Sequence, residues 1–327
     1  MPRLSIIIPF SGGPEYLENT LVSVLQNRPG DCEVLVVHHG AYDDPYQLQD
    51  EVRFVEVSRT TDVIGAINAG FEASQGELLH VLECGAEVEE GWADAALRNF
   101  DDPQVGAVSP LVLRSTDGGR MALAGVGYQI AGKRQTCAAA ATNESPQPPA
   151  ANVVGPSLIA AFYRREAVTR CGGFSASVGE ELTDVDFALS LQDAGYRCVF
   201  ESGSRVSTVQ PYRTGISQFR AGRFEELLFW RHAAEIGLLR SLALHGLLLT
   251  VEGASVLLHP TRLAKLLGRA FAWMELAGKR RQYKSVAGTN RPPATSNNRA
   301  RPRRIDSAHA CNEAHECSVQ NAGPSLQ

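Results

Sequence analysis

The chain has 327 residues, of which 44% are hydrophobic and 20% are charged. This length accommodates one large α/β domain with additions, and the composition excludes a wholly disordered or fibrous protein. Charge is divided unevenly: residues 1–260 carry 19 Lys/Arg against 32 Asp/Glu, a formal −13, whereas residues 261–327 carry 12 against 4, a formal +8. We therefore expect an acidic folded body followed by a basic C-terminal part.

Seven scattered cysteines without CxxC spacing argue against a disulfide framework and against a zinc knuckle. The N-terminal sequence MPRLSIIIPF contains an apolar run too short for a signal peptide. Both features favour a cytoplasmic protein.

Short apolar runs alternate with helical patterns over the first 113 residues. Leu4 to Ile8 is rich in β-branched residues and ends at Pro9, which is typical of a strand buried on both faces of a parallel sheet. Pro14 suits the first turn of a helix, whose apolar side chains recur up to Pro29-Gly30. Further strands are expected at 32–37, 53–57, 78–82 and 105–113, and helices at 63–74 and 92–100. This order predicts a doubly wound α/β fold.

The second half begins with residues 134–152, which are rich in Ala, Pro, Ser, Thr and Asn and have no periodicity, so they are predicted to form a mobile loop. Strands are expected at 157–162 and 197–201, and helices at 165–171 and 184–194. Residues 216–284 have a helical pattern broken at His259-Pro260. Residues 285–327 have little apolar content and are predicted to be disordered.

Four segments in this order resemble family 2 glycosyltransferases with a GT-A fold: SIIIPF, EVLVV, INAGFEASQGELLHVLE and CGGFSASVGEELTDVDFALSLQDAGYRCVF. The resemblance covers roughly residues 3–210. It implies an α/β fold with an open mixed sheet flanked by helices, here followed by a helical C-terminal extension. We expect a glycosyltransferase-like domain at 1–214, a helical region at 215–284 and a disordered tail at 285–327.

The resemblance also implies transfer of a sugar from a nucleotide-sugar donor to a hydroxyl of a carbohydrate or lipid-linked acceptor. In open α/β sheets the ligand binds at the carboxyl ends of the strands. Nucleotide contacts are implied for Pro9, Phe10, His39, Asn68 and Glu83. His39 lies where family members carry a carboxylate that accepts a hydrogen bond from the base, and a neutral imidazole can also accept one.

The family usually has an Asp-x-Asp motif after the fourth strand, where this chain has Glu83-Cys84-Gly85. That motif holds Mg²⁺ or Mn²⁺, a hard cation that prefers carboxylate oxygens and neutralises the leaving diphosphate. Glu83 is the carboxylate that remains as a metal ligand. The acidic residues that follow, Glu87, Glu89 and Glu90, either supply another ligand or form a solvated face. The family's later metal-binding His is not matched, since residues 207–210 read STVQ.

Asp184 is the candidate general base, because the family's Glu-Asp pair at this helix start corresponds to Thr183-Asp184. Inverting transfer needs a carboxylate within hydrogen-bond reach of the acceptor hydroxyl. Two alternatives stay open. Asp184 and Asp186 could serve only the helix N-terminus, with Thr183 as its cap. Glu180 and Glu181 also lie close enough to compete for the role.

The helical C-terminal part raises the question of membrane association. Residues 236–258 are apolar but include Arg240, His245 and Glu252, which disfavours a spanning helix. Residues 261–284 predict an amphipathic helix with apolar residues on one face and Arg262, Lys265 and Arg269 on another. Such a helix either lies on anionic lipid, at the inner face of the membrane, or packs on the acidic body.

Two functional hypotheses follow: an active glycosyltransferase, and a catalytically inactive glycosyltransferase-like binding or scaffold protein. The second is motivated by the departures from the family pattern at His38-His39, Gly85, Thr183 and the missing His. A different α/β nucleotide-binding enzyme is disfavoured, because no GxGxxG follows Ile8 and no GxxxxGK[ST] occurs. A nucleic-acid partner is not expected.

Overall fold

The computed structural model describes residues 2–40, 42, 44–116, 119–129, 132–139, 153–208, 216–256 and 259–286. The chain divides into a compact unit of residues 1–280 and a second unit of residues 281–327. All the contacts below lie within the first unit.

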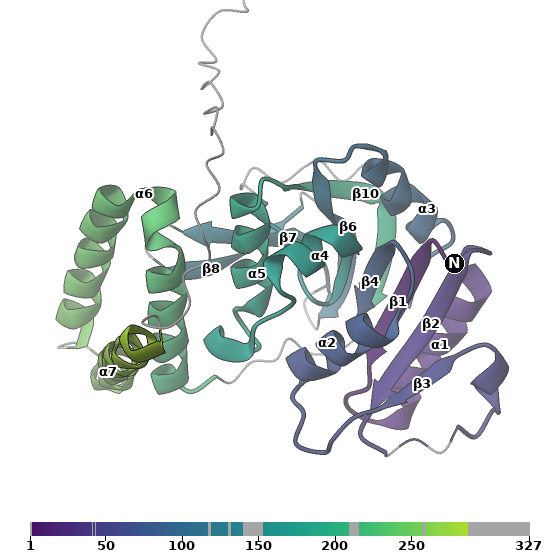
Figure 1. Ribbon diagram of the computed structural model, residues 1–327, viewed down its shortest axis with the longest axis horizontal. Helices are drawn as coiled ribbons and strands as arrows, with labels where there is room; N and C mark the ends of the chain where they lie inside the picture. The colour runs from purple at the N-terminus through teal and green to yellow at the C-terminus, as the bar shows by residue number, and fades with distance from the viewer. Residues whose placement is uncertain are drawn as a thin grey trace, which may run out of the picture. The chain divides into compact units, whose positions relative to one another are not determined.

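Ten strands of the described residues form one mixed sheet, in the order β3-β2-β1-β4-β9-β6-β10-β5, with β7 pairing with β6 and β8 (Figure 1). The strands are β1 Leu4–Pro9, β2 Cys32–His38, β3 Arg53–Glu56, β4 Leu78–Leu82, β5 Ala86–Val88, β6 Val105–Thr116, β7 Gly119–Gln129, β8 Lys133–Ala138, β9 Ala160–Arg164 and β10 Arg197–Thr208. β1 is parallel to β2 and β4, whereas β9 is antiparallel to both β4 and β6. β4 and β6 therefore run in the same direction.

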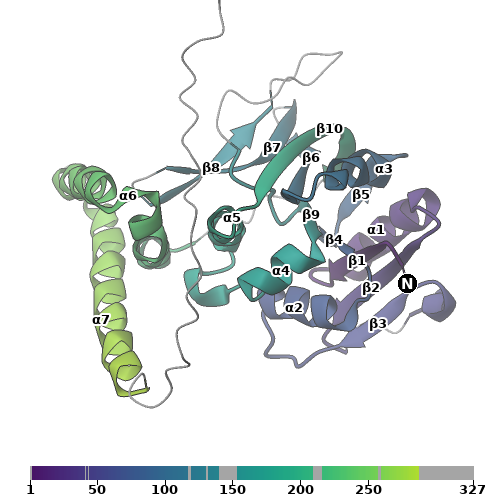
Figure 2. The same ribbon diagram turned by 45° about the horizontal axis from the view of Figure 1, so that its top comes forward.

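The helices are α1 Pro14–Asn27, α2 Val63–Ala73, α3 Trp92–Leu97, α4 Arg165–Cys171, α5 Thr183–Asp193, α6 Gln218–Val256 and α7 Leu263–Val286. Short 3-10 helices lie at Leu48–Asp50, Arg98–Asp101, Ala176–Val178 and Pro260–Arg262. Because successive strand residues face opposite sides of the sheet, Ile6 and Ile8 pack with α1 and α3, while Ile7 packs with α2, α4 and α5. Figure 2 shows these two groups of helices on either side of the sheet.

The expected α/β fold is confirmed, and most of the elements lie within a few residues of the expected positions. The loop expected at 134–152 is wrong for its first residues, because β8 forms there and pairs with β7. The sequence of β8 contains no apolar run, and Cys137 is its only buried residue. β8 is therefore a strand because it pairs with β7 and not because of its local sequence pattern. Residues 140–152 of that expected loop lie outside the described residues. The strand expected at 157–162 begins later, at Ala160.

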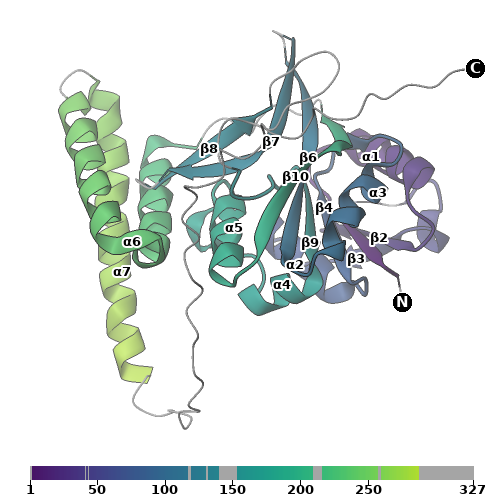
Figure 3. The same cartoon turned by 90° about the horizontal axis from the view of Figure 1, so that it is seen from above.

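The helical C-terminal part breaks at two points. The break expected at His259-Pro260 is confirmed, and a second one occurs inside α6 at Gly237, whose φ of 113° is not helical. Figure 3 shows the two arms of α6 and the long α7 beside them. No helix of the described residues is both long and apolar enough to cross a membrane. The domain boundaries at 214 and 284 stay predictions, as does the disorder of 285–327, of which only 285 and 286 are described.

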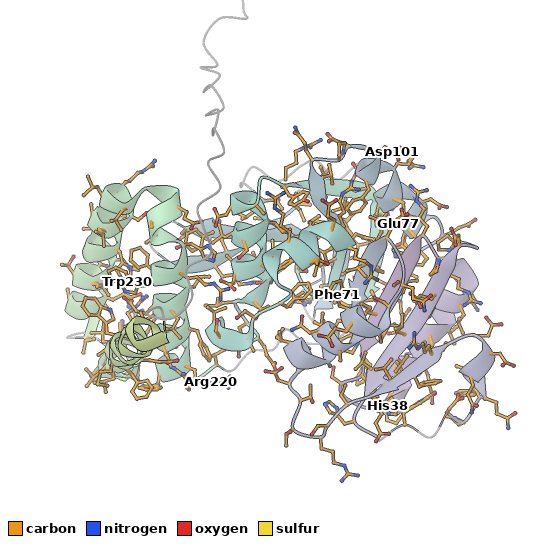
Figure 4. All side chains as sticks on the ribbon, viewed as in Figure 1. His38, Phe71, Glu77, Asp101, Arg220 and Trp230 are labelled. Carbon is orange, nitrogen blue, oxygen red and sulfur yellow. The ribbon has the colours of Figure 1, made fainter. Side chains whose placement is uncertain are left out.

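A buried ionic cluster holds α6 and α7 together. Glu226 is fully buried and accepts hydrogen bonds from Arg269 Nη1 at 2.9 Å, Trp273 Nε1 at 2.7 Å and His245 Nε2 at 3.1 Å. Burial alone raises the pKa of Glu226, but these hydrogen bonds outweigh it and lower the pKa to about 2. Trp230 also donates to Glu226, at 2.8 Å, and is labelled on α6 in Figure 4. The cluster is therefore a structural one.

The basic residues of α7 were expected either to face anionic lipid or to pack on the acidic body. Its basic residues Lys265 and Arg269 turn inward and pair with the α6 residues Glu225 and Glu252. For these two residues the structure supports the second alternative, packing on the acidic body. Several apolar residues of α7 are left exposed, Leu267 by 54% and Met274 by 64%, whereas Ala272 is buried.

Candidate active site

The strand directions bring distant residues to one edge of the sheet. β1, β4 and β6 all end at this edge, so Pro9, Glu83 and Arg114 lie at or just after the ends of three strands. β9 runs the other way and starts at the same edge, where the Ile159 carbonyl accepts a hydrogen bond from the Glu83 N–H at 2.8 Å. This topology explains why residues far apart in the sequence surround one space.

A cavity of about 130 Å³ opens at this edge. Its lining is drawn from the strand ends, from α2 and from the start of α5: Pro9, Ser11, Val63, Ile64, Ile67, Glu83, Arg114, Arg134, Ser157, Leu158, Ile159, Glu180, Glu181 and Asp184. Of the residues singled out in the sequence, Pro9, Glu83 and Asp184 share this cavity, and so do Glu180 and Glu181, the two carboxylates that compete with Asp184 for the role of base. Phe10, His39 and Asn68 are not part of its lining.

Phe10 and His39 lie beside the cavity, at the ends of β1 and β2. The Phe10 ring packs edge-on against Tyr42 with centroids 5.9 Å apart, and Tyr42 stacks on Phe54 at 5.7 Å. His39 Nε2 is 2.9 Å from the Thr61 carbonyl oxygen. Because a carbonyl only accepts, Nε2 carries the hydrogen of a neutral His39, and Nδ1 is then an acceptor.

Asn68 connects α2 to the Gly-Gly-Phe segment. Its Nδ2 donates to the Phe174 carbonyl at 2.8 Å, and its Oδ1 accepts from the Phe174 N–H at 2.9 Å. A Cβ on Gly173, whose φ is 79°, would lie 3.0 Å from the Asn68 Oδ1. Glycine is thus needed at 173 both for its positive φ and for this close approach. These contacts make Asn68 a residue that positions the loop before α5.

The Glu83-Cys84-Gly85 segment offers one carboxylate to the cavity. Burial raises the pKa of the Cys84 thiol to about 11, which disfavours a reactive thiolate at neutral pH. Gly85 has a φ of 92° and donates its N–H to Thr20 Oγ1 at 2.8 Å. An Asp at position 85 would have to adopt a conformation that side chains rarely take.

Among the described residues, a divalent metal ion at Glu83 would have few protein ligands close together. Within the described ranges, no three or more His, Cys, Asp or Glu side chains lie close enough together to hold one. Glu87, Glu89 and Glu90 are exposed, which fits the solvated face considered from the sequence. Gln210, at the position of the family's additional His, lies outside the described residues. The role of Glu83 as a metal ligand stays a prediction.

Asp184 is in the first turn of α5 and is 5% exposed. Its Oδ1 accepts the Val185 N–H at 2.8 Å. Arg134 donates hydrogen bonds to both carboxylate oxygens of Asp184, from Nη2 to Oδ2 at 2.7 Å and from Nε to Oδ1 at 3.0 Å. Thr183 is not the helix cap; it is the first helical residue, and its hydroxyl donates to the Ser175 and Gly179 carbonyls.

Two arginines of the cavity, Arg114 and Arg134, were missed in the sequence. Arg114 follows the apolar run expected as a strand at 105–113, so a charged residue at a strand end was the available signal. Arg134 lies in the segment expected as a loop, and nothing in the local pattern marks it. Asp186, by contrast, faces away to His232 at 2.8 Å and connects α5 to α6.

Comparison with known proteins gives consistent similarities. Residues 5–145 match the family profile "Glycosyl transferase family 2". Polypeptide N-acetylgalactosaminyltransferase 12 of Mus musculus is 27% identical over 123 residues, 34% of this chain and 21% of that protein, and its Homo sapiens counterpart is 26% identical over 123 residues. This chain spans about a fifth of the length of those relatives.

Among solved structures, the crystal structure of GalNAc-T7 with UDP, GalNAc and Mn²⁺ superposes with a TM-score of 0.54 at 14% identity. The match covers 69% of this chain and 48% of that one. The fold is therefore the GT-A fold of glycosyltransferases.

Proposed function

We propose that this chain, whose residues 5–145 belong to glycosyl transferase family 2, moves a sugar from a nucleotide-sugar donor to an acceptor hydroxyl with inversion. The observation that carries the proposal is the shared cavity, in which Pro9 and Glu83 at strand ends meet Asp184 at the start of α5. Ligands of open α/β sheets bind at this edge.

Asp184 acts as the general base in the proposed reaction. The acceptor oxygen attacks the anomeric carbon from the face opposite the diphosphate, and the bond from that carbon to the diphosphate oxygen breaks. The bonding electrons stay with the diphosphate, and the hydroxyl proton passes to the Asp184 carboxylate. A carboxylate accepts about four hydrogen bonds, and Asp184 already accepts three contacts from Arg134 and one from Val185, so the acceptor hydroxyl has to displace one of them, such as the 3.1 Å contact from Arg134 Nε to Oδ2.

The nucleoside end of the donor is assigned to the strand ends next to the cavity. The apolar edge of Pro9 and Phe10 supports a base, and His39 Nδ1 is available in its tautomer to accept a base N–H. Asn68 acts indirectly in this proposal, through the Gly-Gly-Phe loop that it holds.

Release of nucleoside diphosphate from a panel of UDP-, GDP- and dTDP-sugars, with water as acceptor, tests the proposed activity. One donor is expected to be hydrolysed, and Asp184→Asn should slow this about 100-fold or more, the usual contribution of general base catalysis. Asp94→Asn is the matched control, because Asp94 is an exposed carboxylate on α3 that does not line the cavity, and it should leave the rate unchanged. If Glu180→Gln or Glu181→Gln removes the activity and Asp184→Asn does not, the base is misassigned.

The binding or scaffold hypothesis has one observation in its favour: the candidate base is held in a two-point ion pair with Arg134. It predicts that a nucleoside diphosphate raises the melting temperature while no donor is turned over, since ligand binding to the native state always stabilises it. Turnover of any sugar donor that depends on Asp184 rejects this hypothesis.

We further propose that the α6–α7 region docks on a membrane through apolar side chains. Leu239, Leu247, Val251, Leu267, Trp273 and Met274 each expose more than half of their surface. Apolar exposure on this scale marks interaction surfaces. Arg262 on this region is exposed and not among the residues paired with α6, and a basic residue near the surface adds about 1 kcal/mol of attraction to anionic lipid. An acceptor linked to lipid would then lie on the same surface.

Co-sedimentation with phosphatidylcholine vesicles, with and without phosphatidylglycerol, tests membrane docking. The full chain should sediment, more strongly with phosphatidylglycerol, and Leu239→Ser with Leu247→Ser should weaken this severalfold. Val22→Ser is the matched control, because Val22 is an exposed apolar residue on α1. Equal sedimentation of all three proteins would reject the proposed surface.

A further inference from the structure

Two guanidinium groups face the place where a donor diphosphate would lie. Arg114 is at the end of β6 and Arg134 is on β8, and both line the cavity together with Glu83. The neighbouring segment supplies no hard ligand beyond Glu83, since the Cys84 side chain is fully buried and carries a soft sulfur atom, and Gly85 has no side chain. Among the described residues that line the cavity, these two guanidinium groups are the cationic side chains, and they lie there with the carboxylates of Glu83, Glu180, Glu181 and Asp184.

We propose that Arg114 and Arg134 bind and neutralise the donor diphosphate, so that this chain binds nucleoside diphosphates without a divalent metal ion. This inference rests on the proposed function and adds how the leaving group is stabilised. Guanidinium remains protonated at all relevant pH values and presents planar N–H pairs that match phosphate oxygens.

Arg134 can reach a phosphate while keeping Asp184. Its Nε and Nη2 contact the carboxylate, whereas Nη1 donates to Thr136 Oγ1 at 3.1 Å. Thr136 is an exposed, neutral acceptor, and a charged phosphate oxygen is the stronger partner for a guanidinium N–H. If Nη1 exchanges Thr136 for a phosphate oxygen, the Arg134 side chain connects the proposed base, Asp184, with the leaving diphosphate.

Arg114 is the second arginine of the proposed diphosphate site, and it is buried. It is 8% exposed and lies between β7 and β10, opposite Met121 and Thr208 in the strand registers. Interactions between charges are stronger where water is excluded. The attraction between a phosphate oxygen and the buried Arg114 is therefore stronger than the attraction to an exposed arginine. As the sugar leaves, negative charge on the diphosphate grows, and both arginines stabilise the products of bond cleavage.

Isothermal titration of the full chain with UDP, GDP, dTDP and inorganic pyrophosphate, each in EDTA and in MnCl₂, tests the inference. At least one nucleoside diphosphate should bind in EDTA with a Kd within about threefold of that in MnCl₂. Arg114→Gln and Arg134→Gln should each weaken binding in EDTA about 10- to 100-fold, the range for a lost charge-assisted hydrogen bond. Arg134→Lys, which keeps the charge, should recover part of the affinity.

Arg164→Gln is the matched control for loss of a partly buried arginine. Arg164 donates to the Phe100, Asp102 and Val105 carbonyls and does not line the cavity, so its replacement should lower stability and leave nucleotide affinity unchanged. Should an Arg114 variant fail to fold, the comparison of EDTA with MnCl₂ on the unmodified chain still decides.

The outcomes separate the inference from the proposed function. Binding that appears only with MnCl₂, or binding in EDTA that neither arginine variant weakens, overturns the inference and leaves the proposed function standing. Absence of binding by every nucleotide in both buffers overturns the proposed function, and the inference with it.

Discussion

His80 makes the stability of the sheet depend on pH. It lies on β4, is fully buried, and stacks on Phe162 with centroids 3.8 Å apart. Nδ1 is 3.2 Å from the Ala161 carbonyl oxygen and Nε2 is 3.2 Å from Trp92 Nε1. The carbonyl requires a hydrogen on Nδ1, and the indole N–H requires a bare Nε2. Only the neutral ring satisfies both neighbours.

Burial lowers the pKa of His80 from 6.5 to about 3. Between these values the unfolded chain holds a proton on this ring that the native protein does not, so the free energy of unfolding falls as pH falls. The loss begins near pH 6.5 and continues towards pH 3 at about 1.4 kcal/mol per pH unit. Between pH 7 and pH 5 it amounts to about 2 kcal/mol.

Urea unfolding of the wild type and of His80→Gln at pH 7, 6 and 5 isolates this contribution. Every other titrating group is common to both proteins, so their difference in unfolding free energy reports His80. The variant is expected to be less stable at pH 7 because the stacked ring is lost. Its deficit should shrink by about 2 kcal/mol by pH 5, since Gln has no proton to take up. A deficit that stays constant over this range would falsify the account of a buried neutral His80.

Three further changes test other parts of the structure. Arg269→Ala leaves the buried Glu226 carboxylate without its guanidinium and should cost about 3–5 kcal/mol in chemical unfolding; a cost below about 1 kcal/mol would contradict the cluster. Asn68→Ala removes both partners of the Phe174 backbone and should cost about 1–3 kcal/mol, seen as a lower melting temperature. Gly85→Asp restores the family carboxylate at a φ of 92°; it should lose about 1–3 kcal/mol of stability and gain no Mn²⁺ affinity by titration calorimetry, whereas tight Mn²⁺ binding would show that the backbone adapts.

The N-terminal part of the fold was predictable because local pattern and tertiary role agree there. Leu4–Pro9 and Leu78–Leu82 are buried on both faces, so each is a continuous apolar run in the sequence. β8 could not be found this way, since its residues are mostly polar and partly exposed and only pairing with β7 makes them a strand.

The residues of the candidate site could be predicted only where they lie at the end of a strand or at the start of a helix. Pro9 and Glu83 lie at such ends, and Asp184 begins a helix, so order along the chain was enough to bring them together. Arg134 reaches Asp184 across 50 residues, from a segment that carries no local signal. The inward orientation of Arg269 could not be predicted from the sequence either. Helical periodicity separates two faces of a helix but does not indicate which face is buried.

The central claim is that the cavity between Pro9, Glu83 and Asp184 holds the diphosphate of a donor. A crystal structure of the full chain with the nucleoside diphosphate that most raises its melting temperature tests this directly. The account predicts both phosphates inside the cavity, within hydrogen-bond distance of Arg114 or Arg134, and the base against the ends of β1 and β2. A nucleotide bound at any other surface, with the cavity holding only solvent, would contradict it.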